Sequence, residues 1–205
     1  MRRTLTIGLL LLVSAGNAKC GDEMAPFDPV SGFAPPSIVL DDSRGTTSGI
    51  WAKDLPCSAN RASVTVKFDK AYQSTNNHWM PVAKVILGPQ ARNEVADSSR
   101  TAAAAVVKAP TDAFGLTASV WLEQDMGPQS VGPGMAPADL RSPMQINIAW
   151  TPTGEVSANF GGDFHERVSL GRPINEIAVS ASWAKFEFIN LTVGHAGPPN
   201  PACVP

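Results

Sequence analysis

Strict alternation of apolar and polar residues is the feature that most constrains the fold of this chain. In the segment ASVTVKF, Val64, Val66 and Phe68 are separated by single polar residues, and in MQINIAW the same spacing relates Ile146 and Ile148. A period of two places such residues on one face of an extended strand. The alternation therefore predicts β-strands with one face in a core and the other in solvent.

Segments of this kind recur along the chain and are separated by Gly- and Pro-rich joins. The further strands we expect are SIVL (37–40), WMPVAKVILG (79–88), AAAAVVKA (102–109), FGLTASVWLEQ (114–124), ERVSLG (166–171), EIAVSAS (176–182), AKFEFINLTVG (184–194) and a hairpin, AWTPTGEVSANF (149–160). Helix signals are weak, because the alanine-rich segment 89–108 has neither convincing caps nor a periodic apolar face. Nine or ten strands without βαβ alternation predict an all-β fold, an antiparallel two-sheet sandwich or jelly roll.

The N-terminus carries the pattern of a secretory signal peptide. Arg2 and Arg3 precede the apolar run IGLLLLVSAG, and the small residues Gly16 and Ala18 follow. The apolar run is about 10 residues long, too short to cross a bilayer as a helix. We expect cleavage after Ala18 and export to the periplasm or the extracellular space, with no transmembrane segment. Lys19 stands where a lipoprotein signal has a small residue, which argues against lipidation of Cys20.

The charge of the chain argues against nucleic acid as a partner. Cleavage would remove Arg2 and Arg3, so the 16 Lys and Arg fall to 14 against 18 Asp and Glu, and the formal charge becomes −4. A chain of this charge has no basic stripe for a phosphate backbone.

Composition divides the chain into four parts. We expect a signal peptide over 1–18, an irregular N-terminal arm over 19–49, a β-sandwich domain over 50–195 and a Pro-rich tail over 196–205. Within the sandwich, the segment 125–143 is rich in Pro and Gly. It predicts one long loop, which would serve as a lid or a binding loop.

Three cysteines in an exported chain allow one disulfide. We favour Cys57 with Cys203, which would tie the chain end to the folded body. Cys20 with Cys57 is the alternative pairing, and a chain without any disulfide is the third possibility.

The C-terminal half resembles the concanavalin A-like sandwiches, the group that holds lectins, laminin G modules and several glycan hydrolases and lyases. The resemblance rests on INIAWTPTGEVSANF (146–160), VSLGRPINEIAVSAS (168–182) and AKFEFINLTVG (184–194), and it covers about residues 144–194. It implies a jelly-roll sandwich and carbohydrate as the commonest ligand class. A fold does not fix a function, so the site residues must carry that argument.

The segment WLEQDMG (121–127) partly matches a catalytic strand of the same group. Glycosidases of the group carry Glu-x-Asp-x-(x)-Glu, and the resemblance implies that Glu123 is the nucleophile and Asp125 its supporting carboxylate. The second Glu is missing, since Gly127 and Pro128 stand in its place. A retaining glycosidase needs two carboxyl groups about 5 Å apart. This departure argues against catalysis.

Two groups of residues are candidate ligand-binding sites. On the strand 114–124, Trp121 and Glu123 share the polar face, and Asp125 continues it; an indole there offers a flat apolar surface to a sugar ring. The loop QSTNNHWM (73–80) places Asn77 and His78 beside Trp79. The simpler interpretations are a core Trp121 under a loop and a polar loop anchored by Trp79.

No strong metal or cofactor motif is present in the sequence. The turn GGDFHE (161–166) has oxygen ligands for a structural calcium ion, but a solvated turn is the favoured interpretation. We therefore expect no cofactor. The sequence favours an exported, non-catalytic, carbohydrate-binding domain, with a glycan hydrolase or lyase using Glu123 and a structural envelope protein as the alternatives.

Overall fold

A computed structural model describes the backbone of nine segments of the chain: 26–42, 49–72, 81–88, 101–108, 115–124, 127–130, 138–139, 142–160 and 165–197. At positions 49, 101–108, 115–124, 127–130, 138–139 and 165–166 it describes the strand and its pairing without the side chains.

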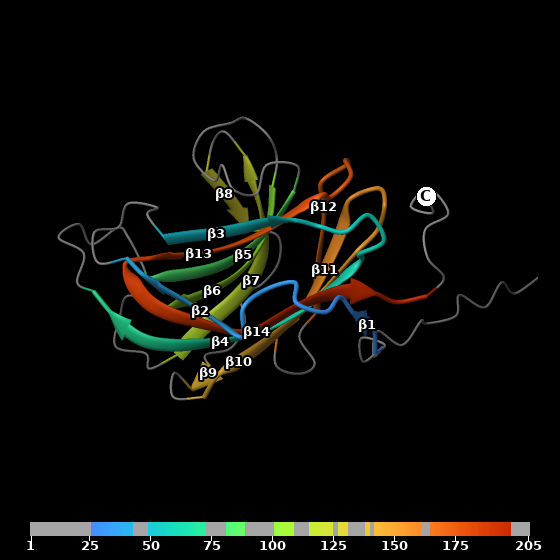
Figure 1. Ribbon diagram of the computed structural model, residues 1–205. Helices are drawn as coiled ribbons and strands as arrows, with labels where there is room; N and C mark the ends of the chain where they lie inside the picture. Colours follow the sequence, from blue (N-terminus) through green and yellow to red (C-terminus); the bar gives the residue numbers. More distant parts are fainter. Residues whose placement is uncertain are drawn as a thin grey trace, which may run out of the picture.

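The described residues form fourteen strands and no helix (Figure 1). They are β1 (Asp28–Pro29), β2 (Ser37–Asp41), β3 (Gly49–Asp54), β4 (Arg61–Ala71), β5 (Val82–Gly88), β6 (Thr101–Lys108), β7 (Gly115–Gln124), β8 (Gly127–Ser130), β9 (Ala138–Asp139), β10 (Met144–Trp150), β11 (Glu155–Phe160), β12 (His165–Ser169), β13 (Glu176–Ser182) and β14 (Ala184–His195).

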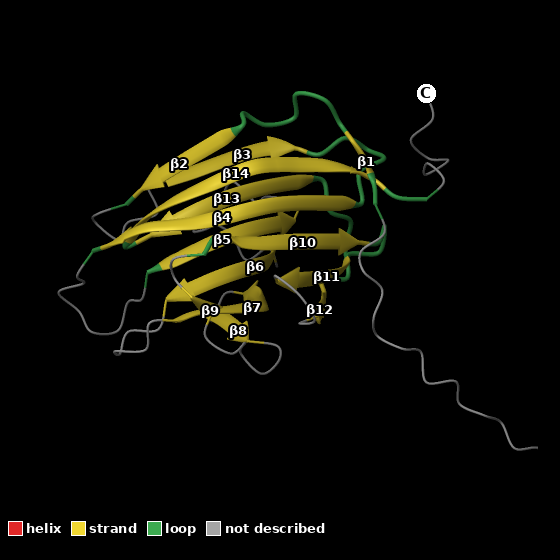
Figure 2. Ribbon diagram, turned by 90° about the horizontal axis from the view of Figure 1, so that it is seen from below, coloured by secondary structure: helices red, strands yellow, loops and turns green. Residues whose placement is uncertain are grey.

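The strands build two antiparallel sheets that pack face to face. The first sheet has the order β1-β14-β4-β10-β11-β12, with β2 also paired to β14. The second sheet has the order β3-β13-β5-β6-β7-β8, with β9 paired to β7. Figure 2 shows the first sheet in front of the second. The predicted all-β, antiparallel two-sheet jelly-roll sandwich is confirmed.

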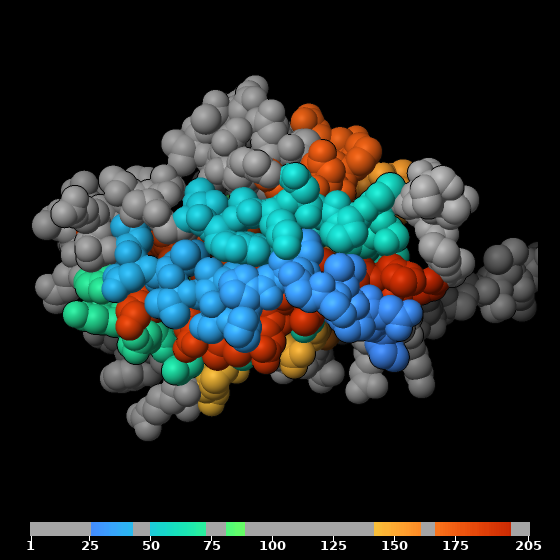
Figure 3. Space-filling model, viewed as in Figure 1, coloured from blue at the N-terminus to red at the C-terminus, as the bar shows by residue number. Residues whose placement is uncertain are grey.

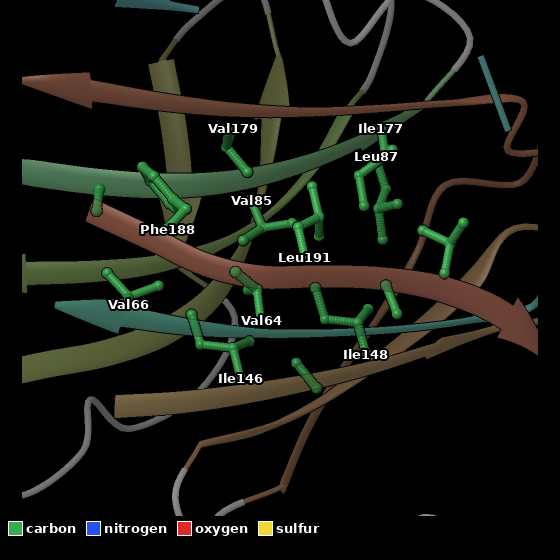
Figure 4. Close-up of a cluster of buried hydrophobic side chains, with 14 of the residues drawn as sticks. Val64, Val66, Val85, Leu87, Ile146, Ile148, Ile177, Val179, Phe188 and Leu191 are labelled. Atoms are coloured by element: carbon green, nitrogen blue, oxygen red, sulfur yellow. The ribbon is translucent and has the colours of Figure 1, made fainter. Parts of the chain in front are cut away.

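The core lies between the two sheets and is built from the apolar positions of the alternating strands (Figure 4). Phe186 and Phe188 of β14 are fully buried. From the opposite sheet, Val85, Leu87 and Val179 point into the same cluster. Trp150, which the alternation predicts to be a core residue, is 5% exposed and packs in this cluster.

The hairpin expected over 149–160 is confirmed. Trp150 pairs with Val156, and the turn between the strands closes with the N–H of Gly154 donating to the carbonyl oxygen of Thr151 at 3.0 Å. Gly154 has a φ of 85°, in the left-handed region that glycine adopts without strain.

The long loop expected over 125–143 is wrong in part. The structure places β8 and β9 within this range, and both pair with β7. These strands have four and two residues, too few for a period of two to be visible in the sequence. Together with β1, they account for three of the strands beyond the expected nine or ten.

The N-terminal segment 26–42 lies along one side of the sandwich, between β3 and β14 (Figure 3). Phe33 is buried there and meets the ring of Trp51 edge-on, with the ring centroids 6.1 Å apart. Lys53 donates from Nζ to the carbonyl oxygen of Phe33 at 2.6 Å. Ile38 and Leu40 of β2 complete the attachment, because both side chains enter the core.

Candidate functional site

The residues proposed from the sequence fall partly outside the described segments. Trp121 and Glu123 lie on β7, whereas Asp125 and the loop residues Asn77, His78 and Trp79 lie outside the described residues. Cys57 is disulfide-bonded. Cys20 and Cys203 lie outside the described residues, so the pairing of Cys57 with Cys203 stays a prediction.

The pairing of β7 places Trp121 and Glu123 in rows that cross the second sheet. Trp121 pairs with Ala103, which pairs in turn with Ile86, and Ile86 pairs with Ala178. Directly paired residues share one face of a sheet. The positions on either side of Ile86 along β5, Val85 and Leu87, belong to the main core, so Ile86 and Ala178 belong to the outer face of the sheet.

Part of this outer face is covered. Ile86 and Ala178 are fully buried and form a second apolar cluster, against which Ile50, Ala52 and Val82 pack. A sugar therefore has no access to the sheet at Ile86. The side chain of Trp121 lies outside what the structure describes, and a sugar-binding role for Trp121 and Glu123 stays a prediction.

The outer face of the first sheet carries a different surface, a row of polar side chains that crosses neighbouring strands. Thr192 of β14 pairs with Ser63 of β4, Ser63 with Asn147 of β10, and Asn147 with Asn159 of β11. The residues before and after each of these strand positions contribute to the core, as Val64 and Ile148 do. We call this row, together with Gln145, the polar row.

Four members of the polar row are joined by hydrogen bonds. Ser63 donates from Oγ to Oδ1 of Asn147 at 2.8 Å. Gln145 donates from Nε2 to Oγ of Ser63 at 3.3 Å and to Oδ1 of Asn147 at 3.4 Å. Thr192 donates from Oγ1 to the carbonyl oxygen of Ser63 at 3.3 Å. These bonds fix the Asn147 amide, whose Nδ2 donates to no group within the described segments.

The polar row could not be predicted from the sequence. Each member does occupy a polar position of an alternating strand, and this signal is present in the sequence. The members come together because β4 pairs with β10 and with β14. In the sequence, Ser63 is 84 residues from Asn147 and 129 residues from Thr192. Alternation assigns a face to each residue but does not say which strands are neighbours.

A cluster of charged and aromatic groups lies at the end of the first sheet where β2 and β4 end and β14 begins. Tyr72 donates from Oη to Oδ1 of Asp41 at 2.7 Å. Lys70 lies with Nζ 5.0 Å from the centroid of the Tyr72 ring, and Lys185 pairs with Asp69 at 2.7 Å. The bond to Lys185 lowers the pKa of the Asp69 carboxyl, and the same bond raises the pKa of Lys185.

We expect the single tyrosine of this chain to titrate at high pH. Its hydrogen bond to the Asp41 carboxylate raises the pKa of the Tyr72 hydroxyl above its ordinary value. Near-ultraviolet absorbance of phenolate formation should give a midpoint above about 10. Because the pKa is raised in the folded state, this bond stabilises the protein below the ordinary pKa and the stabilisation is lost as pH rises through the folded value.

The variant Asp41→Ala tests the cause of this shift. Removing the acceptor should lower the midpoint toward that of an ordinary tyrosine, and the unfolded chain in denaturant should show the same ordinary value in both proteins. A wild-type midpoint equal to that of the unfolded chain would contradict the hydrogen bond.

The described residues offer neither a metal-binding cluster nor a membrane-spanning helix. No group of three or more His, Cys, Asp or Glu side chains there could hold a metal ion. Calcium in the turn 161–166 stays a prediction, because its Asp163 lies outside that part of the chain. None of the described residues belongs to a helix that is long and apolar enough to cross a membrane.

Comparison with known proteins identifies the fold and no family. No protein-family model and no curated protein sequence matches this chain. The membership in the concanavalin A-like group that the C-terminal pattern implies is therefore not established by a family match.

Two solved structures are similar to the chain over most of its length. One is the CBM2 module of the evolved Dit of Lactobacillus casei BL23 phage J-1, with a TM-score of 0.51 and 13% identity; the match covers 82% of this chain and 77% of that one. The other is a mutant of the alginate lyase Aly36B in complex with alginate tetrasaccharide, with a TM-score of 0.52 and 9% identity; it covers 80% of this chain and 82% of that one. At these identities the likeness shows the fold alone.

Proposed function

We propose that this protein is an exported, non-catalytic domain that binds glycans, and that the polar row on the first sheet contacts the sugar hydroxyls. The observation that carries the proposal is the joined set of Ser63, Gln145 and Asn147, which lies on the solvent-facing side of adjacent strands. A rigid sheet holds these groups, so little conformational entropy is lost when they bind a ligand.

The chemistry of the polar row suits sugars. A sugar hydroxyl both donates and accepts, and an amide side chain offers a donor and an acceptor side by side. Oδ1 of Asn147 already accepts from Ser63 and Gln145, which directs its remaining amide N–H groups away from these partners. Gln145 is exposed and keeps its amide oxygen for a ligand hydroxyl.

The charges near the polar row indicate which glycans to test. Arg61 pairs with Ala149 of β10, and Ala149 pairs with Ser157 of β11, which pairs with exposed Arg167 of β12. This second row runs beside the polar row, with small side chains between two guanidinium groups. Acidic polysaccharides therefore belong in the panel beside neutral ones. An alginate tetrasaccharide is bound by one protein that has this fold, which supports the choice.

Binding without cleavage follows from the same chemistry. General acid–base catalysis needs a group that exchanges a proton near the working pH, and hydroxyls and amides do not. The catalytic alternative uses Glu123 on the other sheet. The variant Glu123→Gln distinguishes the two functions, because release of reducing ends or unsaturated products that Glu123→Gln abolishes would establish an enzyme.

A second candidate binding site for the glycan is the strand face that carries Trp121. Stacking of a sugar on its indole would make Trp121→Ala the damaging substitution and would leave variants of the polar row unaffected. Export rests on the segment 2–18, and the disulfide that we favour joins Cys57 to Cys203. Mass spectrometry of the secreted protein tests both.

We expect Asn147→Ala to weaken glycan binding on the order of tenfold, since it removes a fixed donor and leaves Ser63 and Gln145 without their shared acceptor. The measurement is retention on a panel of polysaccharides, alginate and neutral β-glucans included, followed by calorimetric titration with the best one. Asn175→Ala is the matched control, because Asn175 is exposed in the turn before β13.

Two results would overturn the proposal. The first is a wild-type protein that no polysaccharide in the panel retains. The second is an affinity that Asn147→Ala and Asn175→Ala leave equal, which would move the ligand away from the polar row.

A further inference from the structure

The connection between β13 and β14 consists of one residue, Trp183, and it links the second sheet to the first. Trp183 has a φ of 54°. In this region the Cβ atom crowds the backbone, so glycine is the ordinary choice and a bulky residue is an outlier. The chain thus keeps a tryptophan where its conformation is strained.

The contacts of Trp183 with other described residues do not account for this strain. The side chain is half-buried, yet it packs against neither apolar cluster of the described residues. Within that part of the chain its indole makes no hydrogen bond, and the ring pairs found there are Phe33 with Trp51 and Phe68 with Phe186. Strain that folding contacts do not explain is often retained for function.

The neighbours of Trp183 form a fixed polar frame. Its carbonyl oxygen accepts from the N–H of Tyr72 at 2.9 Å, which joins the backbones of the two residues. The hydroxyl of Tyr72 is held by Asp41 at 2.7 Å, and Lys185, the second residue after Trp183, is held by Asp69. Aromatic surface beside oriented donors and acceptors is the usual composition of a small-molecule site.

We infer that this corner is an aromatic subsite, at which the indole of Trp183 stacks against a pyranose ring. The inference rests on the proposed glycan-binding function and extends it, because the polar row itself contains no aromatic side chain. From Trp183 to Thr192, β14 rises about 30 Å, at about 3.3 Å per residue. The subsite is therefore separate from the polar row, and one long glycan could reach both.

The test is the variant Trp183→Gly, measured for stability and for binding. Glycine relaxes the left-handed turn, so the melting temperature should stay the same or rise by a few degrees. Affinity for the polysaccharide that the wild type binds best should fall on the order of tenfold, as expected when a stacked tryptophan is removed. Trp183→Phe keeps a ring and should recover part of the affinity, although its strain remains.

Three results would contradict the inference that Trp183 forms a subsite. A melting temperature of Trp183→Gly lower by on the order of 10 °C would overturn the inference, since it would make Trp183 a packing residue. Equal affinity of Trp183→Gly and wild type, with binding still lost in Asn147→Ala, would overturn the subsite and leave the proposed function standing. A wild-type protein that binds no glycan would overturn both.

Discussion

Phe188→Ala should be among the most destabilising truncations in the first sheet, lowering the free energy of unfolding by about 3–5 kcal/mol. Phe188 is fully buried, and its neighbours across the strands are Val66 of β4 and Ile38 of β2. Figure 4 shows its ring between the two sheets, near Val66. Removal of the ring leaves a cavity that rigid strands on both sides cannot close.

The measurement for Phe188→Ala is equilibrium unfolding in urea, with the slope of the transition compared between the two proteins. In a domain of this size the loss corresponds to a fall in melting temperature of about 6–20 °C. Val39→Ala is the control: Val39 is on β2 as well, but its side chain is 54% exposed, and the change should stay within about 0.5 kcal/mol. A loss below about 1 kcal/mol for Phe188→Ala would show that the ring is not in a packed core.

The local part of the fold could be predicted because each strand shows its own burial. In β10 the pattern of Met144, Ile146, Ile148 and Trp150 is visible as alternation, and all four side chains are buried. The strand expected over 102–109 is harder to predict, because four consecutive alanines favour a helix as well. In the structure this segment pairs with β5 and β7 and forms β6. Tertiary pairing decides such a segment, and propensity does not.

The surface of the fold could be predicted only in pieces. Alternation identifies Ser63 and Asn147 as solvent-facing, but their contact depends on the order of strands in the sheet. The backbone conformation of Trp183 is harder to predict than these contacts. No pattern in the sequence signals a left-handed φ at a tryptophan, because the residue contradicts the preference of that conformation. Both features come from long-range topology, which a single sequence does not contain.

The alignment of the polar row depends on the packing of the opposite, core-facing side of the first sheet. Each strand that contributes to the polar row contributes alternate residues to the core, so the core fixes the register that aligns Ser63, Asn147 and Asn159. A shift by one residue would turn these side chains inward and expose the apolar set. The binding surface is therefore only as well ordered as β11, which carries Asn159, and the edge strand β12 that pairs with it.

Gly154→Ala should weaken the pairing of β11 with β12 and lower the free energy of unfolding by about 2–5 kcal/mol. A Cβ atom on Gly154 would meet the backbone carbonyl of Arg172, so the backbone of the turn that follows β12 must move. The left-handed φ adds a strain of about 1–2 kcal/mol. The displaced backbone also carries the hydrogen bond from the N–H of Leu170 to the carbonyl oxygen of Gly154, which is 2.8 Å long.

Gly171→Ala separates the two contributions to the effect of Gly154→Ala. Gly171 has a similar φ of 66°, but a Cβ atom there has no neighbour within 4 Å. The control should therefore cost only the conformational strain, and the difference between the two variants measures the clash with Arg172. Equal losses would show that the turn moves freely. If the clash does loosen β11 and β12, Gly154→Ala should also weaken glycan binding at temperatures where the core still holds, because Asn159 and Arg167 lie on these two strands.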